Sequence, residues 1–294
     1  MKFGAGLFSM QTHKDLPGVT HRELYKNSID NVKLAEETGF YSAWLSEHHF
    51  LEDGYCSSPL VMAAALANAT NTIRIGTGAF IVTLHNPVRV AEDAATVDII
   101  SDGRFDLGLA IGYRKEEFDG FNIPISQRPS RIEEAIDIIE KSWGDQPFTY
   151  EGKRFNFSNI EVTPKPVQKP LPIYIGAFEE PAIRRAGRLG KPLLIGPGRT
   201  TQMIKDTLGW FNESAIEAGH DPDSIEHILL RETYIADTQN EAIEGGTEYI
   251  INMYKFYFTL GVKIVIRGQQ VKEIDDPLFE HLAEDRFMIG TPEY

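Results

Sequence analysis

Short runs rich in β-branched and aromatic residues alternate with longer amphipathic patterns along most of this chain. The first part places strands at residues 2–10, 41–46, 73–82 and 104–111, and helices at 21–38, 59–69, 88–100 and 129–143. After residue 172 the alternation resumes, with strands at 173–177, 192–195 and 228–236 and helices at 181–189 and 200–218. Strands joined by helical crossovers pair in parallel. The pattern therefore predicts an α/β fold with seven parallel strands, arranged as an open doubly wound sheet or as a closed barrel.

Residues 144–172 interrupt this alternation with a proline-rich segment that contains a candidate hairpin turn at Glu151 and Gly152. We interpret the segment as an insertion in one domain, because a chain of 294 residues has the usual length of a single barrel. No G-x-G-x-x-G follows the first strand, and no G-x-x-x-x-G-K-[ST] occurs. Nucleotide binding of the usual open-sheet type therefore lacks its marker.

The charge balance argues against nucleic acid or an anionic membrane as a partner. Asp and Glu number 43 against 29 Lys and Arg, which gives a net charge of −14. No apolar run approaches the roughly 20 residues that span a bilayer. The sole cysteine, Cys56, cannot form an internal disulfide, and Met1 leads directly into a strand pattern, so we expect a cytoplasmic protein.

The segment from Trp44 to Phe50, WLSEHHF, ends an apolar strand pattern with ionisable side chains. Barrel enzymes build their active sites at the carboxyl ends of their strands, so this segment indicates an enzyme. Successive side chains of an extended segment face opposite ways, which separates His48 from His49. We expect only one of the two to face a pocket, and we expect His49 and Glu47 to orient the strand end or to bond to the next element.

We do not expect a metal site. The adjacent histidines diverge, no second histidine-rich strand end is present, and His85 is the only other histidine at the expected barrel mouth.

Several sequence blocks occur together in an order that resembles the bacterial luciferase-like flavin-dependent monooxygenase family. They are residues 44–50, 76–78 (GTG), 85–93 (HNPVRVAED), 98–112 (DIISDGRFDLGLAIG), 149–152 (TYEG), 164–170 (PKPVQKP) and 290–293 (GTPE). The resemblance covers nearly the whole chain. It implies a (β/α)8 TIM barrel of the luciferase-like type, a single domain over residues 1–294.

The resemblance also implies a reaction. Family members typically take reduced FMN, often from a separate flavin reductase, and form a C4a-hydroperoxide with O2 that oxidises a substrate. We therefore expect a monooxygenase that acts on a small, largely apolar organic substrate. Deazaflavin-dependent hydride transfer is the alternative within the fold, and a non-catalytic flavin-binding subunit is an alternative of another class.

The residues that the resemblance assigns to the site lie at strand ends. His48 matches the catalytic histidine, which we expect to act as a general base or hydrogen-bond partner. The expected cofactor contacts are Thr77, Gly78, Ala79, Ala110, Ile111, Gly112, Ala177, Phe178 and Glu179, and the expected substrate pocket includes Phe8, Trp44 and Tyr113. At Gly78 the lack of a side chain would let a flavin ring approach the backbone.

Two departures from the luciferase pattern affect the phosphate of the cofactor. Ile111 stands where luciferase has an arginine, and Phe178 and Glu179 replace an acidic residue and a serine. An acidic side chain near a phosphate is unfavourable, so we expect transient use of reduced FMN. Backbone N–H groups at the helix containing Pro181, with charge from Arg114, Arg184 or Arg199, are the expected substitutes. Arg231 would either meet an anionic ligand or pair with an acidic residue.

Small residues in the expected helices 59–69 and 88–100 match the helices that form the dimer interface of luciferase-like proteins, so we expect a homodimer. In the family the GTPE block opens a helix that leads to the last strand. By this register the expected final strand and helix of the barrel are missing from the sequence, as they would be in a truncated product. Residues 261–268 would either close the barrel or belong to an irregular excursion at 256–289, and we favour the excursion.

Overall fold

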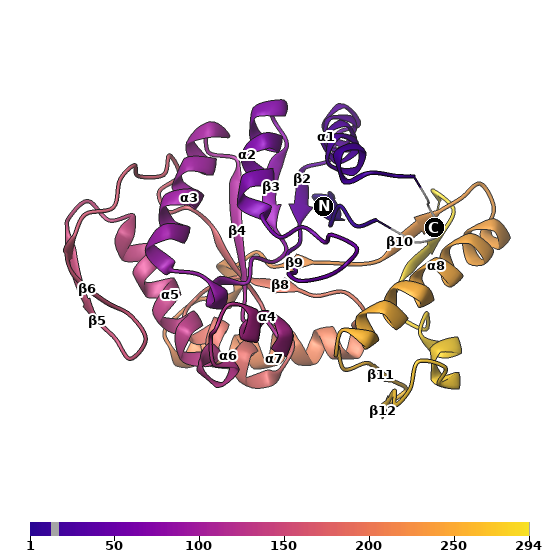
Figure 1. Ribbon diagram of the computed structural model, residues 1–294. Coiled ribbons are helices and arrows are strands. Elements are labelled where there is room, and N and C mark those ends of the chain that lie inside the picture. Colours follow the sequence, from indigo (N-terminus) through magenta and orange to yellow (C-terminus); the bar gives the residue numbers. More distant parts are fainter. Residues whose placement is uncertain (13–17, 294) are drawn as a thin grey trace. The chain divides into compact units, whose positions relative to one another are not determined.

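Five parallel strands form the sheet of the first half of the chain, in the order β1-β2-β3-β4-β7. The computed structural model describes residues 1–12 and 18–293. It divides into two compact units, Met1–Gly176 and Ala177–Tyr294. The strands of the first unit are β1 (Gly4–Phe8), β2 (Ser42–Leu45), β3 (Arg74–Thr77), β4 (Phe105–Ala110) and β7 (Ile173–Gly176) (Figure 1). Because they run in parallel, their carboxyl ends meet at one edge of the sheet.

Helices connect successive strands of this sheet, as the alternation predicts. They are α1 (His21–Glu37), α2 (Pro59–Ala69), α3 (Pro87–Ile100) and α5 (Arg128–Ser142). Local signals fix where they begin: Thr20 forms a capping box with Glu23 before α1, and the Asn86 side chain accepts the Val88 N–H before α3. The strands supply a fully buried core, with Leu45, Ile75 and Leu107 at 0% exposure.

The chain between β3 and α5 departs from the prediction in two places. The strand predicted at 73–82 ends at Thr77, because Phe80 forms only an isolated bridge to Leu109 of β4 before the 3-10 turn η1 (Val82–Leu84). The segment between the predicted strand at 104–111 and the predicted helix at 129–143 contains a short helix, α4 (Lys115–Gly120), and a second 3-10 turn, η2 (Ile125–Gln127). These elements follow strand ends, so they are positioned to carry functional side chains.

The segment at 144–172 contains an antiparallel hairpin of β5 (Phe148–Glu151) and β6 (Asn156–Ile160), which Figure 1 shows beyond α5 at the left edge. Its turn is tied to α5 by Glu134, whose carboxylate accepts the backbone N–H groups of Lys153, Arg154 and Phe155. Because one carboxylate accepts several of its N–H groups, the turn of the hairpin is held in place against α5.

The second unit contains the parallel strands β8 (Leu193–Ile195) and β9 (Ile228–Leu229), the packed helices α6 (Glu180–Arg188) and α7 (Thr201–Glu217), and the turn η3 (Pro222–Ser224). The single strand predicted at 228–236 is wrong. It divides into β9 and β10 (Thr233–Ile235), and β10 pairs in parallel with β13 (Met288–Gly290). Arg231 lies between β9 and β10, and its guanidinium stabilises this interruption by donating to the backbone carbonyls of Arg199 and Arg286.

A long helix, α8 (Gln239–Thr259), precedes the irregular segment. That segment contains the hairpin β11 (Val265–Ile266) and β12 (Gln269–Gln270), followed by η4 (Pro277–His281). Val265 and Ile266 pair with the neighbouring β12. A separate apolar cluster holds this region together, with Ile250, Tyr254, Ile266, Phe279 and Leu282 at its centre.

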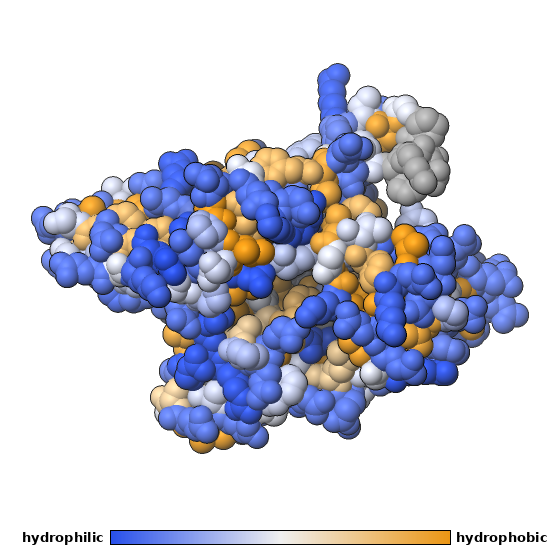
Figure 2. All heavy atoms as spheres, turned by 60° about the horizontal axis from the view of Figure 1, so that its bottom comes forward, coloured by the Kyte–Doolittle hydropathy of each residue, from blue (hydrophilic) through white to orange (hydrophobic). Residues whose placement is uncertain are grey.

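Hydrophilic residues cover most of the face shown in Figure 2, with smaller groups of hydrophobic residues between them. Within residues 1–12 and 18–293, none of the helices combines the length and the apolar character that crossing a bilayer requires.

Candidate active site

The chain stays buried for four residues beyond the end of β2. Ser46, Glu47, His48 and His49 are between 3% and 7% exposed, although all four are polar. Neighbouring segments hold this backbone: Ser46 N–H donates to the Phe8 carbonyl, and His48 N–H donates to the Cys56 carbonyl at 3.1 Å. Buried polar side chains require partners, so the site is defined by what these four residues contact.

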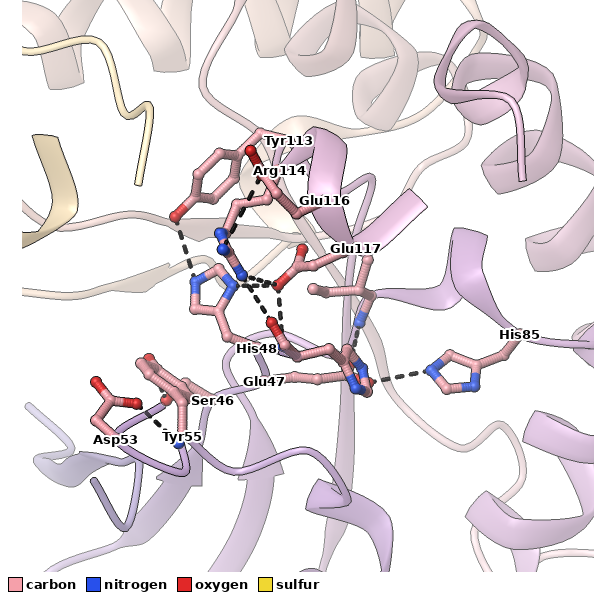
Figure 3. A network of polar contacts seen from close by, with 12 residues as sticks. Ser46, Glu47, His48, Asp53, Tyr55, His85, Tyr113, Arg114, Glu116 and Glu117 are labelled. Carbon is pink, nitrogen blue, oxygen red and sulfur yellow. Dashed lines mark hydrogen bonds and ion pairs between the residues drawn. The ribbon is translucent and has the colours of Figure 1, made fainter. Parts of the chain in front are cut away.

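His48 contacts the stretch 113–117 after β4 and Tyr55, which follows β2 (Figure 3). Its Nδ1 lies 2.8 Å from Glu117 Oε1, and its Nε2 lies 3.2 Å from Tyr113 Oη. The edge of its ring also meets Tyr55, with ring centroids 4.8 Å apart, and Tyr55 Oη donates to Ser46 Oγ. These contacts fix the plane of the imidazole and direct both of its nitrogens.

Glu117 belongs to α4 and is completely buried. Its Oε1 accepts the His49 backbone N–H at 3.0 Å and faces Arg114 Nη1 at 3.4 Å. Arg114 in turn donates to the His49 carbonyl at 2.7 Å. Glu117 therefore ties the segment after β2 to the segment after β4, as Figure 3 shows.

The same contacts indicate the tautomer of His48. Because Glu117 Oε1 already accepts two N–H donors, it behaves as a carboxylate oxygen toward the imidazole, and His48 Nδ1 is the donor. The other nitrogen, Nε2, then presents its lone pair, to which Tyr113 Oη donates. The arrangement prepares Nε2 to accept a proton or a hydrogen bond.

Two buried polar atoms beside His48 have no hydrogen-bond partner among the described residues. They are Glu117 Oε2 and Arg114 Nε. Buried polar groups without partners are rare in folded proteins and often mark a place where a ligand or water binds.

Glu47 faces away from His48 and forms a second group. Its Oε1 lies 2.9 Å from His49 Nε2 and 3.0 Å from His85 Nε2, and its Oε2 accepts the Ile81 N–H. Burial of Glu47 opposes its ionisation, but the hydrogen bonds from His49, His85 and Ile81 outweigh burial and lower the pKa of its carboxyl. His48 and His49 thus take different partners, as the alternation along an extended segment predicts.

Small residues end three neighbouring strands of the first unit. A Cβ added at Gly176 would lie 3.6 Å from the Cβ atoms of Ala79 and of Ala110. The peptide bond from Gly78 to Ala79 is cis, and Gly78 N–H donates to the Leu45 carbonyl. Ala79, Ala110 and Gly176 therefore form a patch, called here the small-residue platform, where a planar group can approach the backbone. The two alanines are among the predicted cofactor contacts, whereas Gly176 is not.

The other expected cofactor contacts of the first unit have structural partners. The Thr77 hydroxyl is buried and exchanges hydrogen bonds with the backbone of Gly108, which joins β3 to β4. The Ile111 carbonyl accepts the Thr83 hydroxyl. Gly112 has φ +72°, and a Cβ there would lie 2.7 Å from Ile81 Cγ2, so both its backbone angle and its surroundings require glycine.

The three expected pocket residues occupy different environments. Tyr113 is 37% exposed and contacts His48, and Phe8 is half-buried at the end of β1. Trp44 is 4% exposed, and its Nε1 donates to Ser42 Oγ, back along the strand. Its ring covers Gly76, where a Cβ would lie 2.3 Å from Trp44 Cζ3. Trp44 is therefore buried against β3, and its place in the substrate pocket stays a prediction.

Ala177, Phe178 and Glu179 begin the second unit. Ala177 is buried, whereas Phe178 is 58% exposed. Arg199 donates to the Phe178 carbonyl at 2.5 Å, and its guanidinium lies 5.3 Å from the centroid of the Phe178 ring. Glu179 is the N-cap residue of α6, and its side chain makes no capping bond.

The arginines expected to supply charge for a phosphate differ in availability. Arg114 is committed to Glu117 and the His49 carbonyl, and Arg184 pairs with Glu180 and Glu213. Arg199 is buried and also donates to Thr207, but its Nε has no partner among the described residues. Arg231 donates to backbone carbonyls, and both alternatives that its position in the sequence offers stay predictions.

Comparison with known proteins now decides the family. The family model described as luciferase-like monooxygenase matches residues 1–283. The chain belongs to the luciferase-like monooxygenase family. It is 29% identical over 258 residues to an alkanal monooxygenase alpha chain from a Kryptophanaron alfredi symbiont, covering 87% of this chain and 71% of that one. It is 30% identical over 271 residues to the oxygenase component of a flavin-dependent trigonelline monooxygenase from Acinetobacter baylyi, covering 90% and 72%.

Solved structures agree with a luciferase-like fold. Monooxygenase RslO1 from Streptomyces bottropensis has a TM-score of 0.85 and 25% identity, over 100% of this chain and 85% of that one. An F420-dependent secondary alcohol dehydrogenase has a TM-score of 0.76 and 20% identity, over 99% and 86%, and at that identity it shows the fold alone. The predicted α/β fold of the luciferase-like TIM-barrel type and the prediction of an enzyme family are confirmed.

Proposed function

We propose that this luciferase-like protein is a flavin-dependent monooxygenase that uses reduced FMN and O2 to oxidise a small, largely apolar organic substrate. The observation that carries the proposal is the buried Glu117–His48–Tyr113 network, which directs His48 Nε2 with its lone pair available. The trigonelline monooxygenase relative is named as flavin-dependent, which supports the choice of cofactor.

The small-residue platform fits a flavin ring. Ala79 and Ala110 carry only a methyl group and Gly176 has no side chain, so the backbone there is accessible to a planar group. When bound there, reduced FMN supplies the electrons with which O2 is activated for transfer of one oxygen atom to the substrate. Within the second unit, the start of α6 and Arg199 stay the sequence-based candidates for binding a phosphate.

In the proposed reaction His48 exchanges a proton at Nε2. Glu117 holds the Nδ1–H, so that a proton gained at Nε2 gives an imidazolium stabilised by the carboxylate. Tyr113 Oη donates to Nε2 and is the group that a substrate or oxygen species would displace. A positioned general base of this kind contributes about 10²- to 10⁴-fold to a rate.

The test compares three mixtures of the wild-type protein with a panel of small ketones, aldehydes and aromatic substrates. Reduced FMN with O2 should give product, whereas reduced FMN without O2 should not. Robust anaerobic turnover with reduced F420, together with no product from the aerobic flavin mixture, would overturn the proposal.

Deazaflavin-dependent hydride transfer is the second candidate, since an F420-dependent secondary alcohol dehydrogenase shares the fold, and the fold alone does not choose between the two cofactors. In that reaction His48 would exchange the proton of a substrate alcohol at the same Nε2. The anaerobic arm of the experiment above separates the two reactions. A non-catalytic flavin-binding subunit would show no turnover in any arm.

Two partners belong to the proposal. A separate flavin reductase would supply reduced FMN, since reduced flavin consumed at each turnover must be renewed. A second copy of this chain would cover α2 and α3, where Val61 is 73% exposed and Ile99 and Ile100 are 42% and 44% exposed.

A further inference from the structure

The cluster of Glu47, His49 and His85 lies outside the proposed reaction and combines three side chains that ligate metals. One atom from each, Glu47 Oε1, His49 Nε2 and His85 Nε2, lies within 4.8 Å of the other two. The ligands come from two segments, since Glu47 and His49 follow β2 and His85 follows the 3-10 turn η1. We propose that this cluster binds one divalent transition-metal ion, with Zn²⁺ as the preferred ion.

Two of the three ligand distances require little movement. Glu47 Oε1 lies 2.9 Å from His49 Nε2 and 3.0 Å from His85 Nε2. Zinc bonds of about 2.0–2.2 Å in tetrahedral geometry separate neighbouring ligand atoms by about 3.4 Å. An ion would therefore open these two contacts by a few tenths of an ångström and bring the two imidazole nitrogens, which lie within 4.8 Å of each other, to the same separation.

The ligand types suit zinc. Two imidazoles and one carboxylate form a three-residue set that catalytic zinc sites use, and water takes the fourth position. Among the ion pairs of the described residues, the cationic partners of Glu47 are His49 and His85 alone. A divalent ion would therefore neutralise a buried carboxylate that has no lysine or arginine beside it.

The surrounding residues already orient the ligands. Glu47 Oε2 accepts the Ile81 N–H, which leaves Oε1 directed toward both imidazoles. Phe80 stacks on His85 with ring centroids 4.4 Å apart, and the edge of His49 meets Phe121 at 4.8 Å. Such partners fix the orientation of a ligand before an ion binds. The His85 side chain is 27% exposed, so an ion and its water can reach the cluster from solvent.

The structural consequence of the ion would be to hold the segment that carries His48. Glu47 and His49 flank His48, and the His49 N–H donates to Glu117 Oε1. An ion bound by Glu47, His49 and His85 would join the end of β2 to the segment before α3 and limit movement of the backbone at His48. The site is independent of the proposed reaction, because ion binding is measured without flavin or substrate.

The test is equilibrium dialysis and calorimetry of the purified full chain, freed of metal with a chelator, against Zn²⁺ and separately against Co²⁺. We expect one ion per chain, a visible Co²⁺ ligand-field absorption, and a rise in melting temperature with Zn²⁺. His85→Ala should weaken binding more than about tenfold and abolish the Co²⁺ absorption. His220→Ala, which removes a histidine of the second unit, should change neither.

The Co²⁺ spectrum of the wild-type chain tests the site even if His85→Ala does not fold. No stoichiometric uptake by the wild type would overturn the proposal. Uptake that a folded His85→Ala variant retains with wild-type affinity would overturn it as well, since the ion would then bind elsewhere.

Discussion

Glu117 Oε1 lies 2.8 Å from His48 Nδ1, and both side chains are buried. The two residues are 69 positions apart in sequence and meet because the segments after β2 and β4 reach the same edge of a parallel sheet. This contact assigns a donor role to Nδ1 and leaves Nε2 for chemistry. The proposed function depends on it.

Glu117→Gln should disturb this relationship without emptying the site. The amide can donate to His48 Nδ1, which favours the opposite tautomer, and we expect kcat to fall about 10²- to 10⁴-fold. Nitrogen NMR of labelled histidine should show the proton moved from Nδ1 to Nε2. The matched control is Glu116→Gln, since the neighbouring Glu116 side chain is 69% exposed. Equal kcat for both variants and the wild type would contradict the assigned role of Glu117.

Gly176→Val should block the small-residue platform. A Cβ at Gly176 has ordinary contact distance to Ala79 and Ala110, but the added γ-methyl groups would cover the surface that the flavin is proposed to use. We expect the Kd for reduced FMN to rise more than about tenfold, which is about 1.4 kcal/mol, while circular dichroism stays unchanged. Gly209→Ala is the control, because nothing lies within 4 Å of a Cβ at Gly209. A folded Gly176→Val variant with wild-type FMN affinity would place the flavin elsewhere.

Stability should depend on Glu36 at low pH. Its carboxylate accepts the backbone N–H groups of Asn71, Thr72 and Ile73. Burial opposes ionisation, but these hydrogen bonds outweigh it and lower the pKa of Glu36 to about 2. Because the folded pKa lies below the unfolded value of about 4.3, the stabilisation is present above about pH 4.3 and is lost as pH falls toward 2.

Glu36→Gln should therefore lower the free energy of unfolding at pH 7 by about 1 kcal/mol or less, since the group is largely solvated. The difference from the wild type should shrink between pH 4.3 and pH 2, as measured by urea denaturation. Glu37→Gln, at the exposed neighbouring position on α1, should show no such convergence. A Glu36→Gln difference that stays constant across this range would refute the linkage.

Val61→Glu should dissociate the proposed homodimer. Val61 lies on α2 and is 73% exposed, so a carboxylate there leaves the folded chain intact but would be buried without a partner at a dimer interface. Analytical ultracentrifugation should show a dimer for the wild type and a monomer for the variant. Val167→Glu introduces the same charge at a site that is 51% exposed and should remain dimeric. A monomeric wild-type protein would contradict the proposed homodimer.

The sequence predicts the regular elements of the first unit well. The α2 boundaries match at both ends, because Pro59 opens the helix and the apolar run defines its length. The predicted strand at 228–236 fails because its β-branched pattern hides a break that long-range contacts impose. Arg231 donates there to the carbonyls of Arg199 and Arg286, which lie at distant sequence positions.

The site is only partly predictable for a related reason. The motif around His48 identifies the segment, and alternation separates His48 from His49. Glu117 carries a weaker signal, because its run of charged residues is equally typical of a solvated loop. Glu47, His49 and His85 converge because the chain turns after β3. The apolar pattern extends the predicted strand past this turn. The expectation of no metal site rested on the divergence of His48 from His49 and on the lack of a second histidine-rich strand end.

The most direct test of the proposed reaction is incorporation of labelled oxygen. Wild-type protein, reduced FMN and ¹⁸O2 are mixed with the substrate panel, and products are analysed by mass spectrometry beside His48→Ala. We predict one ¹⁸O atom per product molecule with the wild type and at least about 100-fold less product with His48→Ala. Product without ¹⁸O, or equal product from both proteins, would contradict flavin-dependent oxygen transfer at His48.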